Sequence, residues 1–241
     1  MKDQFYGKSY RVFRTITRLF YPNYQPENTD TNTHSVVYVS HHEHFRGPLS
    51  IMLWTEKPMH IWALSAFYEQ PTCCKQIVQY PFVKRFGWNE KAALIICLPL
   101  SYIISALVRS ANAIPVYRGS REIVKTFRQS VDALSKGDNI LIFPDVHYDN
   151  RSPIIGEIDP GFLHLEKYYY RKTKKHLTFI PVYASKSQKK IVQGKPIAFQ
   201  DGVDFKIEQE RVKEALHSSL IQLATACGDG LSNDCRKDVA K

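Results

Sequence analysis

Polar clusters follow three predicted strands of this sequence, at the point where each strand ends. They contain imidazole, guanidinium and carboxylate groups, which together can accept a proton and hold an anion. Because the carboxyl ends of parallel strands share one edge of a sheet, where ligands bind, we expect one site that holds a base, a cation and a carboxylate. The clusters are His41-His42-Glu43-His44, Arg118-Gly119 and Asp145-Val146-His147-Tyr148-Asp149.

The elements that position these clusters are visible as apolar patterns. Short β-branched and aromatic runs at 36–39, 114–117, 139–143 and 178–183 predict buried strands. An apolar stripe predicts a helix over 121–136, with Ser120 as its N-cap and Gly137 just past its end, and a closing helix over 207–226. Strands that alternate with helices predict one α/β domain with a largely parallel sheet flanked by helices.

A basic amphipathic helix is predicted over 5–21, ahead of a polar connector. We therefore divide the chain into a helix and connector, 1–34, and an α/β domain, 35–241. A basic helix with aromatic residues is able to lie in a lipid interface, and packing on its own domain is an equally good interpretation. Charges interrupt the opening stretch, so no secretory signal is expected.

The stretch 92–108 carries no formal charge and lies at the lower length limit for a membrane-spanning helix. Pro99 falls inside it, and several hydroxyl groups dilute it. A spanning helix would also split the α/β domain. We therefore expect a buried or interfacial helix that is broken near Pro99.

Net charge and cysteine usage limit the partners and the compartment. The 241 residues carry a net charge of +10 and have a sequence pI of about 9.3, and much of the excess lies in 1–22 and 166–195. An anionic partner is expected, and an anionic membrane face suits these patches. The five cysteines form no paired framework, which favours a cytoplasmic location at the membrane face over secretion.

Four blocks of this sequence, in order, resemble the glycerolipid acyltransferase family, which includes the lysophosphatidic acid acyltransferases. That family shows a strand leading into Asn-His-x-Ser-x-x-Asp, a strand followed by Arg, a strand followed by Phe-Pro-Glu-Gly-Thr-Arg, and a hydrophobic strand containing Pro. The corresponding blocks here are Val39–Gly47, Ile114–Gly119, Ile142–His147 and Phe179–Val182.

The resemblance implies transfer of a fatty acyl group from a thioester to the hydroxyl of a lysophospholipid or glycerol phosphate. It implies that His42 is the base, that Arg118 with Gly119 holds the acceptor phosphate, and that Asp145 stands where the family has Glu. His44 and His147 would contact the acceptor from the same clusters. The donor is acyl-CoA or an acyl-carrier protein as co-substrate, with no further cofactor and no metal.

One departure from the family pattern affects the base. The family aspartate, five positions after the base, falls on Gly47, which has no side chain to orient an imidazole. Losing such a carboxylate lowers the rate by about 10⁴-fold where it has been measured. Asp145 is the preferred replacement, ahead of Asp149 and Glu43, and Gly47→Asp is expected to raise activity if the rest of the site is intact.

Other classes of function remain open. One is a catalytically degenerate relative that binds lipid. Another is a metal-dependent hydrolase, because His41, His42, His44, Asp145, His147 and Asp149 offer the ligands that zinc or manganese prefers. Nucleic-acid binding through the basic and tyrosine-rich segment 168–175 is disfavoured, because no nucleic-acid-binding signature accompanies it.

Overall fold

The structure is a computed structural model, and it describes residues 5–27, 35–85, 87–147 and 151–231. Contacts divide the chain into two compact units. The first contains the chain up to Leu19 together with His60–Gln129, and the second contains Phe20–Met59 and the chain from Ser130 onward. In this division the first helix groups with 60–129. The predicted boundary after residue 34 stays a prediction.

The second unit is built on a mixed sheet in which the parallel strand β2 is central. The strand order is β1–β7–β6–β2–β5, with β8 beside β6. Strand β2 is parallel to both neighbours, and Val37 lies opposite Ile140 and Phe179. Strands β7 and β8 run antiparallel to β6. The strands are β1 (Gln25–Pro26), β2 (Val37–Ser40), β5 (Asn139–Ile142), β6 (Thr178–Ser185), β7 (Lys190–Gln193) and β8 (Ile197–Ala198).

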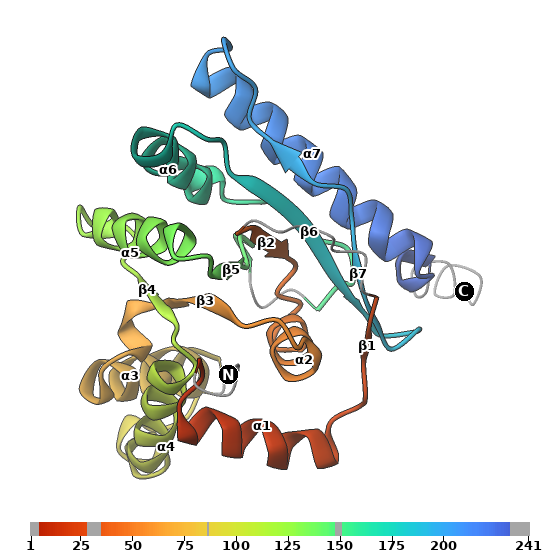
Figure 1. Cartoon of the computed structure of the whole chain (residues 1–241). Coiled ribbons are helices and arrows are strands. Elements are labelled where there is room, and N and C mark those ends of the chain that lie inside the picture. Colours follow the sequence, from red (N-terminus) through yellow and green to blue (C-terminus); the bar gives the residue numbers. More distant parts are fainter. Residues whose placement is uncertain (1–4, 28–34, 86, 148–150, 232–241) are drawn as a thin grey trace. The chain divides into compact units, whose positions relative to one another are not determined.

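Helices cover both faces of this sheet, which explains why its strands are apolar without alternation. Ile51 of α2 (Arg46–Trp54) packs with Tyr38 and Leu141 on one face. Ala224 of α7 (Phe205–Ala226) packs with Tyr183 on the other, and Figure 1 shows α7 running along β6. Helix α6 (Leu165–Thr173) follows a 3₁₀ turn (Pro160–His164), and a second 3₁₀ turn (Asp229–Leu231) follows α7. The predicted α/β fold with a largely parallel sheet is confirmed.

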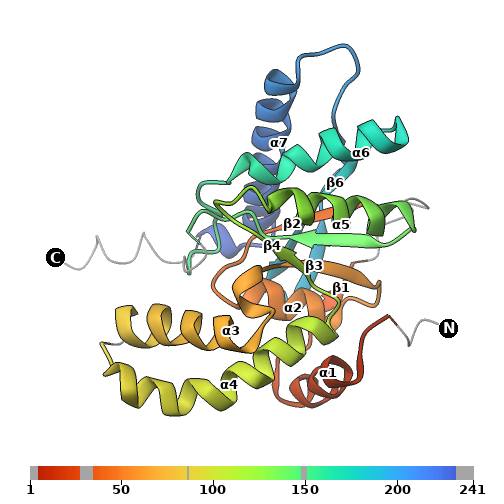
Figure 2. The same ribbon diagram turned by 90° about the vertical axis from the view of Figure 1, so that its left-hand side faces the viewer.

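The first unit combines a pair of parallel strands with a helical hairpin, of which the sequence predicted only the second arm. Trp62 of β3 lies opposite Ile114 of β4. Buried Cys73, Cys74 and Cys97 join the two arms of the hairpin, α3 and α4 (Figure 2). The elements are α1 (Lys8–Phe20), β3 (Met59–Leu64), a 3₁₀ turn (Ser65–Phe67), α3 (Gln70–Ile77), a π-helical segment (Val78–Arg85), α4 (Glu90–Ser110) and β4 (Ile114–Val116).

Helix α5 (Ile123–Ser135) begins and ends as its sequence predicts, and the division between the units falls within it. The hydroxyl of Ser120 accepts a hydrogen bond from the N–H of Glu122 at 3.0 Å. Gly137 follows with φ of 95°, a conformation that suits a residue without a Cβ. Capping chemistry therefore fixes this helix locally.

Helix α4 differs from the prediction in one respect, because it continues through Pro99 without a break. Of the two predicted settings, buried or interfacial, the buried one does not fit, since 22% of its apolar window is buried. Proline removes one backbone donor, at a cost of about 3 kcal/mol in a helix interior. Packing of Ala93 and Cys97 against α3 holds the helix together across that position.

Candidate functional site

The ends of the neighbouring strands β2 and β5 bring Asp145 to the two histidines that follow β2. Val39 pairs with Ile142, so the residues just beyond them share one edge of the sheet. Asp145 is 3% exposed. One of its oxygens, Oδ1, contacts Nδ1 of His41, and Oδ2 accepts a hydrogen bond from the backbone N–H of His42 at 2.9 Å. A single carboxylate therefore fixes the ring of one histidine and the backbone of the next.

His41 is a buried donor in this arrangement. Its Nε2 lies 2.8 Å from the carbonyl oxygen of Ser152, and its Nδ1 faces Asp145. A carboxylate and a carbonyl oxygen thus contact the two ring nitrogens of this buried side chain. Because both nitrogens already have partners within the protein, the ring of His41 is held as part of the scaffold.

Backbone pairing holds the carboxylate in place. Asp145 forms an isolated bridge with Ile158, and the N–H of Val146 donates to Glu157 at 3.1 Å. The N–H of Asp159 donates to Pro144 at 2.9 Å. The segment that carries Asp145 is thus paired on both sides of this residue, which orders the carboxylate before any ligand binds.

The ring of His42 lies against aromatic side chains. Phe143 approaches it edge-on with ring centroids 5.5 Å apart, and Phe45 lies 6.1 Å away. The sequence hypothesis has Asp145 orienting this ring, whereas the contact that Asp145 makes with His42 is through the backbone N–H. Glu43, the least favoured replacement, pairs with Arg46.

Gly47 occupies a position where a side chain does not fit. A Cβ placed on Gly47 would lie 2.1 Å from the carbonyl oxygen of His41 and 3.1 Å from that of His42. The N–H of Gly47 also donates to the carbonyl of His42 at 3.2 Å. An aspartate at position 47 therefore requires the start of α2 or the end of β2 to move, because an added Cβ would overlap a backbone oxygen.

The chain reverses direction between β2 and α2 through an uncommon backbone conformation. Glu43 and His44 have positive φ values of 39° and 61°. Residues other than glycine adopt this region rarely, and such strain gathers at functional sites. This tight turn brings Gly47 close to the backbone of His41. His42 is half-buried just before the turn.

The remaining predicted site residues lie in different parts of the chain. His147 is exposed shortly after Asp145, and Asp149 lies outside the described residues. Arg118 and Gly119 form an exposed turn directly after β4, in the first unit. In the described part of the chain, no three His, Cys, Asp or Glu side chains are grouped so that they can hold a metal ion.

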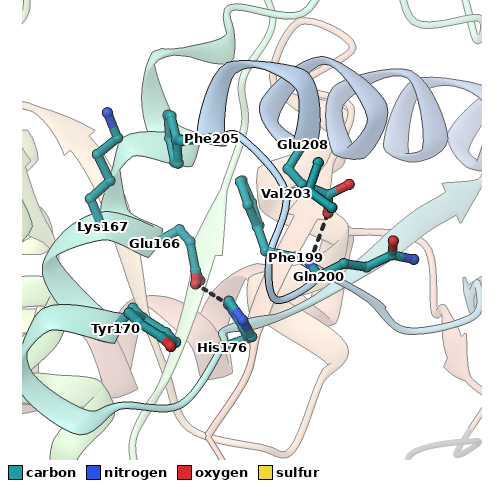
Figure 3. Close-up of a pocket in the computed structure, with 9 residues that line it drawn as sticks. All are labelled: Glu166, Lys167, Tyr170, His176, Phe199, Gln200, Val203, Phe205 and Glu208. Atoms are coloured by element: carbon teal, nitrogen blue, oxygen red, sulfur yellow. Dashed lines mark hydrogen bonds and ion pairs between the residues drawn. The ribbon is translucent and has the colours of Figure 1, made fainter.

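A pocket of about 130 Å³ lies elsewhere in the second unit (Figure 3). His176 stands just before β6, so the pocket is at the amino end of the parallel strands, opposite the edge that carries His42. Glu166 contacts Nδ1 of His176 at 2.6 Å, and Tyr170 stacks on the same ring at 4.7 Å. Nε2 of His176 lies 3.0 Å from a carboxylate oxygen of Asp201.

These groups hold elements together. Glu166 also accepts from the N–H of Leu177 at 2.9 Å, so its carboxylate ties α6 to the start of β6. Desolvation lowers the pKa of His176, but hydrogen bonds to Glu166 and Asp201 outweigh it, and the pKa is raised above its ordinary value. The pocket is therefore a structural junction whose polar groups already have partners.

Sequence reasoning assigned His41 no role in the acyltransferase hypothesis and named it only as a ligand in the metal-hydrolase alternative. The sequence did contain one signal, because two neighbouring parallel strands that both end in ionisable residues bring those residues together. In the structure, His41, the first residue after β2, turns its ring toward the carboxylate of Asp145. His42, the second, donates its backbone N–H to the same carboxylate. The contribution of Ser152 had no sequence signal, because its contact is a backbone carbonyl.

Comparisons with known proteins give a fold neighbour. No protein-family profile matches the chain, and no curated protein matches it. Among solved structures, the chain is similar to the crystal structure of the 1-acyl-sn-glycerophosphate acyltransferase PlsC from Thermotoga maritima, with 14% sequence identity and a TM-score of 0.49. The similarity covers 88% of this chain and 76% of that chain. At this identity and score, it does not define the chemistry of this chain.

Proposed function

We propose that this protein is an acyltransferase that moves a fatty acyl group from a thioester to the hydroxyl of a lysophospholipid or glycerol phosphate, with His42 as the base. One observation carries the proposal. The motif blocks in β2, β5 and β6 lie side by side, with Val39 paired to Ile142 and to Pro181. The ionisable residues after two of these strands are in contact, as a shared site requires.

The chemistry follows from the position of His42. A ring nitrogen accepts the proton of the acceptor hydroxyl while the oxygen attacks the thioester carbonyl. The C–S bond breaks as the C–O bond forms, and the thiolate that leaves takes the proton back from the imidazolium. Arg118, with Gly119, is proposed to hold the acceptor phosphate through its forked donors, and His44 and His147 to contact the acceptor. The donor is acyl-CoA or an acyl-carrier protein.

Asp145 has a positioning role in this proposal. Its two oxygens contact the His41 ring and the His42 backbone N–H, so it fixes the backbone that carries the base. These two contacts, one from each oxygen, prevent the buried carboxyl group from rotating away. The residue that sequence reasoning proposed as catalytic thus acts through the backbone.

A second candidate function is a catalytically degenerate protein that binds lipid. The observation that favours it is Gly47, whose contact with the carbonyl of His41 leaves no space for the family aspartate. Without that aspartate the base lacks its usual orienting group, an effect of about 10⁴-fold in rate in a comparable triad. The metal-hydrolase alternative has no comparable geometric support.

The proposed partner is an anionic membrane face on the cytoplasmic side. Exposed cations of the two basic patches support this, among them Lys8, Arg11, Lys174 and Lys175. Other cations of these patches are already paired, Lys172 with Asp132 at 2.6 Å and Lys190 with Glu27 at 2.8 Å. Each free cation near an anionic surface contributes about 1 kcal/mol, so this part of binding should weaken as salt increases.

Release of free thiol tests the proposal directly. The purified protein is incubated with lysophosphatidate and a series of acyl-CoA and acyl-carrier donors. We expect turnover that falls at least about 100-fold in His42→Gln, the usual contribution of a general base. His217→Gln, which changes a half-buried histidine on α7 that contacts the carbonyl of Gly156, is the matched control and should retain activity. Folded protein that turns over no donor yet binds lysophosphatidate vesicles would favour the degenerate candidate.

A further inference from the structure

Helix α4 buries its small residues and exposes its large apolar ones, which is the reverse of a helix that packs on the core of a water-soluble domain. Its inward stripe consists of small residues that are at most 1% exposed, namely Ala93, Cys97, Ser101 and Ser105. Its outward positions carry large apolar side chains, with Ile95 77% exposed and Ile103 57% exposed. The other outward residues are Leu94, Ile96, Leu98 and Tyr102. Small residues at helix contacts and large apolar residues outside are typical of helices that face lipid.

The two ordinary explanations for an apolar helix of this length do not apply. A core helix of a soluble domain is mostly buried, whereas 22% of the apolar window of α4 is buried. A signal sequence lies near the N-terminus, whereas α4 begins at Glu90. The polar groups on the inward side have partners, since Gln70 donates to Ser101 at 2.9 Å and Ser101 donates to Leu98 at 2.7 Å.

Charges and aromatic residues flank the apolar face as a bilayer requires. Lys91 lies before the uncharged stretch and Arg109 after it, and both are exposed. Trp88, 43% exposed, precedes the helix. Lysine, arginine and tryptophan at the ends of an apolar segment suit the headgroup region of a membrane.

Helix α1 continues this surface from the end of α4. The N–H of Gly7 donates to the carbonyl of Ser110 at 2.7 Å, and the N–H of Tyr10 donates to the Ser110 hydroxyl at 2.8 Å. Figures 1 and 2 both show α1 beginning beside the end of α4. Leu19 and Phe20 at the other end of α1 are 76% and 85% exposed.

We propose that the outward face of α4 inserts into the acyl-chain boundary of an anionic phospholipid bilayer, with the helix lying along the interface. A spanning orientation is disfavoured because α3 is packed along α4 and exposes Thr72 and Lys75. Carrying that ammonium group into the hydrocarbon core is expensive. Insertion of this face is independent of the acyltransferase chemistry, and it adds an apolar component to the electrostatic binding by the basic patches.

Vesicle flotation separates the two components. The full chain is mixed with vesicles of phosphatidylcholine, with and without phosphatidylglycerol, at low salt and in about 1 M NaCl, where the Debye length is about 3 Å. We expect a binding component that survives high salt. The double variant Ile95→Gln with Ile103→Gln should reduce this component by about 100-fold, because each buried isoleucine contributes about tenfold. The matched control, Ile207→Gln, changes an isoleucine of α7 that is 64% exposed and should bind like the wild type.

A second measurement keeps the test independent of how the double variant folds. In Ile95→Trp, lipids brominated on the acyl chain should quench the new fluorescence, and the wild type measured in parallel gives the quenching of its own tryptophans. Equal high-salt binding by the double variant, or no added quenching in Ile95→Trp, would overturn the proposal. Lipid-free self-association that the double variant abolishes, without vesicle binding, would instead assign the face to a second copy of the chain. No outcome depends on turnover.

Discussion

Substitution of Gly47 is the sharpest test of how the candidate site is built. An added Cβ would lie 2.1 Å from the backbone oxygen of His41, and real Cβ contacts shorter than 3.0 Å essentially do not occur. About 0.9 Å must therefore open between α2 and the end of β2. The carbonyl that must move belongs to the residue whose ring pairs with Asp145.

We expect Gly47→Ala to lower the free energy of unfolding by about 2 kcal/mol, within the range seen when atoms are forced into a packed site. Gly47→Asp should lower it further, because it also buries a carboxylate next to the carbonyl oxygens of His41 and His42. Both variants should lose acyl transfer rather than gain it. Urea unfolding followed by circular dichroism measures the stability, and thiol release measures the activity.

Gly161→Ala is the matched control in the same unit. There an added Cβ meets nothing nearer than the side-chain carboxylate of Asp159 at 3.0 Å, which can move. Its stability should stay close to that of the wild type. If Gly47→Ala were as stable as Gly161→Ala, or if Gly47→Asp raised turnover, the close approach of α2 to β2 would be refuted. Position 47 would then have enough space for the aspartate of the acyltransferase family.

Three further predictions concern ionisable groups. Asp145→Asn should lower the free energy of unfolding by about 1–3 kcal/mol, because the buried ring of His41 loses the carboxylate that contacts its Nδ1. In a His41→Gln background the loss measured by urea unfolding should be smaller. The pKa of His176 is raised above its ordinary 6.5, so its hydrogen bonds stabilise the fold fully below pH 6.5. The free energy of unfolding in urea should therefore decline as pH rises above about 6.5. In His176→Gln this decline should be shallower. Burial desolvates Asp229, but hydrogen bonds from Ser185, Ser187 and Tyr183 outweigh this effect and lower its pKa. Its contribution to the free energy of unfolding is therefore present above pH 3.8 and is lost as pH falls through the lowered pKa. Acid unfolding of Asp229→Asn, which lacks this titration, should therefore show a weaker pH dependence in that range.

Residue types and local periodicity were enough to predict the strands and helices whose signals lie within their own segments. The buried strands β2, β5 and β6 were predicted because a strand covered on both faces is apolar throughout. Helix α5 was predicted because Ser120 and Gly137 mark its ends by local capping chemistry. The order of these elements was enough to predict a largely parallel sheet.

Features that depend on contacts between distant segments were decided only by the tertiary structure. For the segment of α4 the sequence predicted a buried or interfacial helix broken near Pro99. Sequence shows that a stripe is apolar, but not which side of it a neighbouring helix covers. The partner of Asp145 was taken to be the ring of His42. In the fold the chain turns so that His41 faces the carboxylate and His42 offers its backbone, because adjacent residues of an extended chain point in opposite directions. The sequence shows the glycine at position 47 but not why a glycine is needed there. In the fold, a Cβ at this position would lie 2.1 Å from a backbone oxygen, because α2 folds back onto the end of β2.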